Sequence, residues 1–325
     1  MDFRLEFTPR AFEKKIAHHH KLFLAGSCFT EQIGAKLVAH KFQIIDNPNG
    51  ILFNPISIAK SLTGYIEQKL YTEDDLFYNN ELWGSWDHHT RFSSISKDAC
   101  LDGINQSQRA AHKFLKDADW LLLTLGSAFV YELEQKRVVA NCHKVPTDKF
   151  NKRLLSVEEV VTTLDGFIYR VKKFNPRLNI IFTISPVRHL RDGFVENNRS
   201  KSTLINAVHH MVDKFEGLFY FPAYELIIDD LRDYRFFAED MVHPNYAATN
   251  YVWEKFVSCC IAEPSQQLMK AIKEVNAARK HKAFNPASAA HKRFLQTYLE
   301  KAKKLVEEHS YLDLDDEIRY FSAQQ

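Results

Sequence analysis

The 325-residue sequence has almost no net charge, because 43 basic and 41 acidic side chains leave only +2 at pH 7. A nucleic-acid-binding protein normally carries a clear excess of positive charge, so no nucleic-acid partner is expected. Long apolar runs are also missing, and no segment approaches the roughly 18 apolar residues of a membrane span. The opening residues, MDFRLEFTPRAF, lack the uninterrupted apolar stretch of a secretory signal. We therefore expect a cytoplasmic protein with no membrane partner.

Cysteine and glycine are also scarce. The five cysteines are scattered and odd in number, and two of them, Cys259 and Cys260, are adjacent. Reduced thiols are therefore expected in place of a disulfide framework. No two of the ten glycines lie close enough for a loop that cradles a phosphate. The sequence therefore suggests no nucleotide chemistry, and we expect no cofactor.

Hydrophobic residues, by contrast, make up 45% of the chain, enough for a large core. The run WLLLT at 120–124 is almost wholly apolar, which is typical of a strand covered on both faces. Apolar strand segments of this kind alternate with helical segments along the chain. This alternation predicts an α/β fold with a three-layer α/β/α parallel sheet. We expect strands at 22–25, 42–45, 120–124, 179–184 and 218–221, and helices at 29–40, 57–69, 106–116, 157–174, 200–215 and from 246 onward.

The composition changes near residue 262, where lysine, glutamate and alanine become frequent. We expect a main domain over residues 1–261 and a helical C-terminal extension over residues 262–325, with helices at 265–282 and 287–308. The second of these helices has an apolar stripe at helical spacing. The extension is expected to pack on the main domain or on a second subunit, which would make a homo-oligomer.

Two potential nucleophiles stand side by side at the end of the first apolar run, which stops at Gly26 and is followed by Ser27 and Cys28. A helix that starts here would offer backbone N–H groups to a thiolate or an oxyanion. Ligands of parallel α/β sheets bind outside the carboxyl ends of the strands. Ser127 and His189 also follow predicted strands, so all four side chains should gather at that edge.

A potential base lies near the end of the main domain, where Asp240 and His243 are three residues apart. An aspartate beside a histidine can orient the imidazole and stabilise the imidazolium, as in a catalytic triad. The spacing is a weak signal alone, and it gains weight from the strand-end Gly-Ser-Cys turn at the start of the predicted five-strand α/β unit.

The remaining candidates are loop residues with both a functional and a structural interpretation. Gly50 could bring a backbone N–H close to a reacting carbonyl, and Asn54 could donate from its amide or simply cap a helix. His88 and His89, in ELWGSWDHHTR, could bind a polar group of a substrate, although a structural role is the simpler interpretation of each. His143 beside Cys142 lacks the partners of a zinc site, so no metal is expected. The run His18–His20 is expected to be a solvated loop.

The passage around Cys28 resembles the first conserved block of the GSCFA family, which is grouped with the SGNH/GDSL-type hydrolases. Here the block reads G-S-C-F-T. Further blocks carry the resemblance over roughly residues 20 to 260: GILFNP (50–55), SWDHH (85–89), NCHKVP (141–146), SPVRH (185–189), NNRSK (197–201) and LRDYRFFAEDMVHP (231–244). The resemblance implies a flavodoxin-like, SGNH-hydrolase-like sheet with strand order 2-1-3-4-5. It also implies a Ser-His-Asp site built from the first block and the closing D-x-x-H.

Two departures from the hydrolase pattern matter. The wider family has its serine third in Gly-Asp-Ser, and the third residue here is Cys28, so Ser27 can serve only if the turn is shifted by one residue. The block that normally supplies an oxyanion-hole asparagine reads Gly-Ser-Ala-Phe after the run WLLLT. Either Asn54, Ser127 or a loop histidine replaces that donor, or catalysis differs. Loss of one such donor typically costs about 2.7–4 kcal/mol.

The leading interpretation is an acyl hydrolase (esterase or thioesterase) or acyltransferase. Cys28 or Ser27 would attack the carbonyl, His243 would act as base and then acid, and Asp240 would orient His243. The residues expected to bind the oxyanion or a small acyl ester or glycan-type substrate are Gly50, Asn54, Ser127, His88, His89, His143, Arg188 and His189. The alternative is a non-catalytic carbohydrate- or small-molecule-binding module on the same fold. A metal-dependent hydrolase that uses the three loop histidines ranks last.

Overall fold

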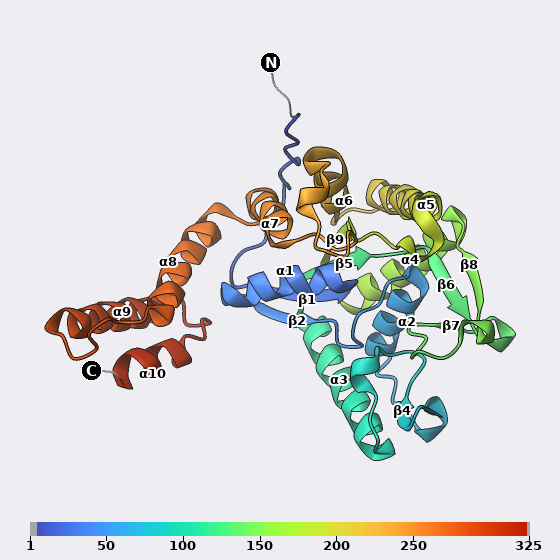
Figure 1. The fold of residues 1–325 in the computed structure, drawn as a ribbon, viewed down its shortest axis with the longest axis horizontal. Coiled ribbons are helices and arrows are strands. Elements are labelled where there is room, and N and C mark those ends of the chain that lie inside the picture. The colour runs from blue at the N-terminus through green and yellow to red at the C-terminus, as the bar shows by residue number, and fades with distance from the viewer. Residues whose placement is uncertain (1–4, 324–325) are drawn as a thin grey trace.

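A central parallel sheet of five strands organises the computed structural model, which describes residues 5–323 (Figure 1). Its order β10-β9-β5-β1-β2 corresponds to 2-1-3-4-5 when the five strands are numbered along the chain. The three-layer flavodoxin-like prediction is therefore confirmed. The strands are β1 (Lys21–Gly26), β2 (Gln43–Asp46), β5 (Trp120–Leu125), β9 (Asn179–Ile184) and β10 (Leu218–Tyr220).

The two faces of the sheet are covered by different helices, because successive strand residues point to opposite sides. In β1, Phe23 and Ala25 join one core with α2, α3, α4 and α5, whereas Leu22 and Leu24 join a second core with α1 and α7. These helices are α1 (Cys28–Ala39), α2 (Pro55–Ile66), α3 (Lys97–Asp117), α4 (Val157–Phe174), α5 (Gly193–Lys214) and α7 (Tyr246–Cys260).

Two small antiparallel sheets, which the sequence did not predict, are inserted between the main elements. A hairpin joins β3 (Phe77–Asn79) to β4 (Leu82–Gly84), and β6 (Phe129–Glu132) pairs with both β7 (Val138–Val139) and β8 (Asn151–Leu154). Single turns of helix fill the remaining connections: η1 (Glu73–Asp75), η2 (Thr90–Phe92), η3 (Glu134–Lys136), η4 (Thr147–Lys149), η5 (Leu190–Asp192), α6 (Ala223–Glu225), the π-helical η6 (Leu226–Leu231) and η7 (Tyr234–Phe236).

The C-terminal helices α8 (Glu263–Lys280), α9 (Ala289–Glu308) and α10 (Asp315–Ala323) lie to one side of the sheet (Figure 1). They share an apolar core of their own, which includes Ile272, Leu299 and Phe321. Glu317 of α10 receives ion pairs from Lys41, just after α1, and from Arg279 of α8. The domain division between residues 261 and 262 remains a prediction. None of the helices in residues 5–323 is long and apolar enough to cross a membrane.

The expected solvated loop at His18–His20 is wrong for His18, which is only 2% exposed. Its ring stacks on Phe42, and its Nε2 lies 2.8 Å from the carbonyl oxygen of His40. Burial lowers the pKa of His18 to about 4. The polar run at residues 18–20 therefore gave no indication of the contact between the entry segment and the end of α1.

Candidate active site

The turn from β1 into α1 depends on Gly26, whose φ of +142° is a conformation that L side chains rarely adopt. A Cβ at this position would lie 2.2 Å from the carbonyl oxygen of Thr124 on the neighbouring strand. The amide of Gly26 donates to Asn47 Oδ1 at 2.8 Å, and the amide of Ser27 donates to Thr124 at 3.1 Å. The turn is thus held on both sides, and α1 begins at Cys28.

Ser27 and Cys28 differ sharply in accessibility. Ser27 is fully buried, and its Oγ has no hydrogen-bond partner within the described part of the chain. Ser27 also makes no side-chain cap on α1. Cys28 is partly exposed, so of the two candidate nucleophiles it is the one that solvent reaches.

Opposing effects act on the Cys28 thiol. Burial raises its pKa most, and the negative charge of Glu31 raises it further. The backbone N–H groups of Cys28 and Phe29, in the first turn of α1, lower it, and so does the charge of Lys201. The net pKa is raised, which means that the thiol needs a base before it can react as a thiolate.

The predicted pair of Asp240 and His243 is joined by a short contact, with Asp240 Oδ2 2.7 Å from His243 Nδ1. The other carboxylate oxygen accepts the backbone N–H groups of Val242 and His243 at 2.9 and 3.0 Å. These bonds, led by the His243 amide, lower the pKa of Asp240 to about 2. Because an ionised carboxylate can only accept, His243 Nδ1 must carry the proton, and Nε2 remains free as a base.

The loop after β9 connects this pair to the sheet. The amide of Arg188 donates to the carbonyl oxygen of Val242 at 3.2 Å, and its guanidinium lies 4.1 Å from the ring centre of Phe237. The neighbouring His189 has a pKa lowered to about 3, first by burial and then by the positive charges of Lys201 and His243. The two loops therefore meet at the carboxyl edge of the sheet, as the sequence predicts for His189.

Three candidate oxyanion donors also make structural hydrogen bonds. The amide of Gly50 donates to the carbonyl oxygen of Asn47 at 2.7 Å, so it closes a turn and does not point to an open site. Asn54 caps α2 by accepting the amide of Ser57 at 2.8 Å. Ser127 Oγ accepts the amide of Phe129 at 3.0 Å, and its own amide donates to the carbonyl oxygen of Phe53. All three have well-defined structural roles.

The loop histidines form a packed layer around Ser85. His88 is fully buried, with Nδ1 3.1 Å from Ser85 Oγ, and His143 Nε2 lies 2.9 Å from the carbonyl oxygen of Ser85. His89 starts η2, and its ring accepts the amide of Arg91. Across residues 5–323, the structure has no group of three or more histidine, cysteine, aspartate or glutamate residues that could hold a metal ion.

Lys201 is a site residue that the sequence did not single out. It lies on α5, is only 1% exposed, and donates from Nζ to the carbonyl oxygens of Gly126 (2.6 Å) and Ser185 (2.7 Å). These two residues directly follow β5 and β9, so the ammonium sits at the carboxyl edge of the sheet. Burial lowers the pKa of Lys201 to about 7, and the charge of Cys28 acts in the opposite direction. The motif NNRSK contained this lysine, but nothing in its polar neighbours predicted burial.

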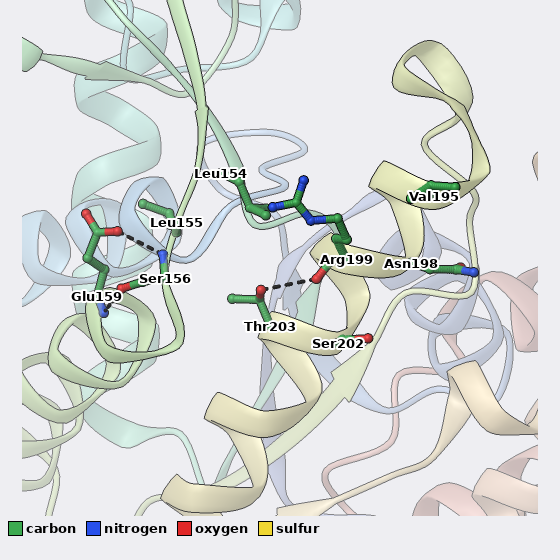
Figure 2. A pocket seen from close by; sticks show the side chains of 9 residues that line it. All are labelled: Leu154, Leu155, Ser156, Glu159, Val195, Asn198, Arg199, Ser202 and Thr203. Carbon is green, nitrogen blue, oxygen red and sulfur yellow. Dashed lines mark hydrogen bonds between the residues drawn. The ribbon is translucent and has the colours of Figure 1, made fainter.

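A groove of about 760 Å³ lies between α5 and the segment that joins β8 to α4 (Figure 2). Figure 2 shows Asn198 and Arg199 of α5 on one wall and Leu154, Leu155 and Ser156 on the other. None of the predicted site residues lines this groove. The volume of this groove therefore does not indicate where Cys28 and the Asp240–His243 pair lie.

Comparison with known proteins identifies two matching family models. The model of the GSCFA family matches residues 21–256, and that of the GSCFA domain protein C-terminal domain matches residues 272–325. No curated protein sequence matches the chain.

Several solved esterase and hydrolase structures resemble the fold at low identity. LAE5, an alpha/beta hydrolase enzyme from the metagenome of Lake Arreo, is 12% identical with a TM-score of 0.41, covering 75% of this chain and 96% of its own. A carbohydrate esterase family 3 protein from Talaromyces cellulolyticus is 10% identical with a TM-score of 0.35, covering 78% and 99%. A family 3 carbohydrate esterase of Clostridium thermocellum is 7% identical with a TM-score of 0.36, covering 78% and 98%.

Proposed function

The chain belongs to the GSCFA family, and from that premise we propose that it is an SGNH-like acyl hydrolase or acyltransferase that acts on an ester or thioester. The proposal is carried by one observation, the 2.7 Å contact between Asp240 and His243 on a loop bonded to the carboxyl edge of the sheet. A histidine held in this way has one free nitrogen and a neighbouring negative charge, which are the requirements of a general base.

In this mechanism Cys28 is the nucleophile. His243 Nε2 takes the thiol proton while Sγ attacks the carbonyl carbon, and the imidazolium that forms is stabilised by Asp240. The protonated histidine then gives its proton to the leaving group, which departs and leaves an acyl-thioester on Cys28. Water or an acceptor alcohol attacks that thioester, with His243 again as base, and releases the acyl product.

The oxyanion of the tetrahedral intermediate would be held at the first turn of α1. Ser27 does not cap this helix with its side chain, so the N-terminal amides are available to a negative charge. The same amides, those of Cys28 and Phe29, lower the pKa of the thiol. One pair of donors can thus serve the thiolate and the oxyanion in turn, which compensates for the asparagine missing after β5.

The test is a set of single variants assayed on a panel of acyl esters and thioesters. We expect Cys28→Ala and His243→Gln each to remove most of the activity, and Asp240→Asn to reduce it by about three to four orders of magnitude, as when the orienting carboxylate of a triad is lost. Ser27→Ala should retain activity. Cys142→Ser and His210→Gln are matched controls, since neither side chain takes part in the proposed mechanism and His210 is exposed on α5. Activity that survives in the double variant lacking Cys28 and His243 would exclude the mechanism.

A second candidate is a non-catalytic carbohydrate- or small-molecule-binding module on the same fold. It is favoured by the raised pKa of the Cys28 thiol, which keeps most of the thiol protonated at neutral pH. Iodoacetamide distinguishes the two functions, because a base-activated Cys28 should react faster than Cys142, which is also partly exposed. Equal labelling of the two cysteines, together with no turnover of any acyl substrate, would support the binding module.

A further inference from the structure

A row of α1 side chains, Cys28, Gln32 and Lys36, runs along one face of that helix, because residues four apart lie one above the other. Two members of the row contact α7. Gln32 bonds to Thr249, and Lys36 donates to Asn250. The proposed nucleophile therefore begins the row of α1 that meets α7, and α7 itself begins three residues after the proposed base.

Thr249 joins this row to the loop of the base. Its side chain is 6% exposed, and Oγ1 lies 2.8 Å from Oε1 of Gln32 and 2.9 Å from the carbonyl oxygen of Asn245. A hydroxyl has one proton and cannot donate to two oxygens, and a backbone carbonyl can only accept. Exchanging the amide O and N positions of Gln32 satisfies all three groups. Gln32 then donates to Thr249, and Thr249 donates to Asn245.

Asn245, at the end of this relay, fixes the loop that carries the base. Its backbone N–H donates to the carbonyl oxygen of Phe236 at 2.9 Å, and its Nδ2 donates to the carbonyl oxygen of Arg235 at 2.7 Å. Its Oδ1 accepts the backbone N–H of Ala248 at 3.1 Å and so caps α7. The two arms of the loop, before and after the proposed base, are therefore held by one residue.

We propose that Gln32 and Thr249 are positioning residues that hold the proposed base at a fixed distance from the Cys28 thiol. The inference rests on the proposed function, in which the base takes the thiol proton. Gln32 is about 6 Å along the helix from Cys28, and Asn245 is at most about 7 Å along the chain from His243. The relay is thus short at both ends. Displacement of a catalytic group by about 1 Å can lower a rate about a hundredfold, so a device that holds this distance has a direct effect on catalysis.

The test is the rate of iodoacetamide alkylation of Cys28, followed by mass spectrometry of the peptide that contains it. In the otherwise wild-type chain, His243→Gln should slow alkylation, because the thiol has lost the base that takes its proton. Thr249→Val keeps the shape of the side chain and removes the hydroxyl. In that background we expect His243→Gln to have little further effect, so that the ratio of the two rates falls toward one. Gln32→Leu should act in the same way.

Two variants serve as controls. Thr249→Ser keeps the hydroxyl and should preserve the full effect of His243→Gln. Thr163→Val removes a hydroxyl that bonds to the carbonyl oxygen four residues earlier in α4, as that of Thr249 does in α7, and it should leave the effect unchanged. Urea unfolding of each variant measures stability separately, because a merely structural role of Thr249 would lower stability without changing how alkylation depends on His243.

The possible results separate this inference from the proposed function. If His243→Gln slows alkylation equally in the wild type and in folded Thr249→Val, the positioning role is refuted and the proposed base is unaffected. Gln32 is only partly buried, so Gln32→Leu decides the matter in the same way if Thr249→Val fails to fold. If His243→Gln has no effect in the wild-type chain, the base of the proposed function is refuted, and the positioning role is refuted with it.

Discussion

Replacing Gly26 by alanine should damage the protein more than any other single-methyl change at the β1–α1 turn. The new Cβ would lie 2.2 Å from the carbonyl oxygen of Thr124, about 1.2 Å closer than the 3.4 Å at which ordinary contact begins. The obstacle is backbone in the middle of the sheet, so no side chain can swing away. The φ of +142° adds strain of about 1–3 kcal/mol for a residue that carries a Cβ.

Relief of this clash requires β1 and β5 to separate where β1 ends. Three bonds then weaken: Gly26 to Asn47, Ser27 to Thr124, and Leu52 to Gly26, now 2.8, 3.1 and 2.9 Å long. A buried hydrogen bond contributes about 1 kcal/mol. Together with the strain, we expect Gly26→Ala to lower the free energy of unfolding by about 3–5 kcal/mol, a large part of the roughly 5–15 kcal/mol of a typical domain.

Urea unfolding followed by circular dichroism measures this loss as a lower transition midpoint. Gly166→Ala is the matched control, since Gly166 is exposed within α4 and a Cβ there meets nothing within 4 Å. That change should stabilise the protein by about 0.5–1 kcal/mol, because alanine favours the helix. A Gly26→Ala protein within about 1 kcal/mol of the wild type would show that the close approach of β1 and β5 is not required for stability.

Two further predictions concern a buried histidine and a buried glutamate. Burial lowers the pKa of His88 to about 3, whereas the pKa in the unfolded chain is near 6.5. The contribution of neutral His88 to the free energy of unfolding is therefore fully present above pH 6.5. It is lost as the pH falls toward 3, at up to about 1.4 kcal/mol per pH unit. His88→Phe should flatten this acid dependence in unfolding measured at several pH values, and an unchanged slope would contradict the assignment. Glu317→Gln weakens both charged contacts of Glu317, with Lys41 and Arg279. If the free energy of local opening of α10 falls by about 1.4 kcal/mol, amide hydrogen exchange in α10 should become about tenfold faster. Unchanged exchange there, with Glu300→Gln on the exposed face of α9 as control, would mean that these contacts do not hold the helix.

The main sheet could be predicted from the sequence because its strands are short apolar runs with clear ends. The strand at Asn179–Ile184 and the helix at Val157–Phe174 have the predicted bounds. For that helix the reason is a capping box, in which Ser156 and Glu159 bond reciprocally at 2.8 and 3.1 Å. Such signals are local, so no knowledge of distant contacts is needed.

Other elements were predicted with the wrong bounds or missed altogether. The helix expected at 106–116 begins at Lys97, where Ser96 caps it, and the one expected at 200–215 begins at Gly193. Gly103 lies in the first of these added segments and Gly193 begins the second, and glycine is a poor helix former, so neither segment was recognised as helix. The sheet of β6, β7 and β8 joins segments separated by loops, so its pairing cannot be inferred from either strand alone.

The candidate site also contains features that the sequence predicts and features that it does not. The Asp240–His243 contact follows from a spacing of three residues within one loop, and the sequence predicts it. The burial of Ser27 depends on the helix turn, and the position of Lys201 depends on carbonyl oxygens at the ends of two strands. Polar residues with buried roles need the whole fold before they can be recognised, and the same is true of His18.

The strand order also has a consequence for the synthesis of this protein. β1 leaves the ribosome first but belongs in the interior of the sheet, between β2 and β5, so one of its edges stays unpaired until residue 125 has emerged. His243 follows more than a hundred residues later. At the roughly 5–20 residues per second of translation, this delay lasts several seconds. A nascent chain therefore carries the thiol long before its base, and the enzyme that we propose would become active only after residue 243 has emerged.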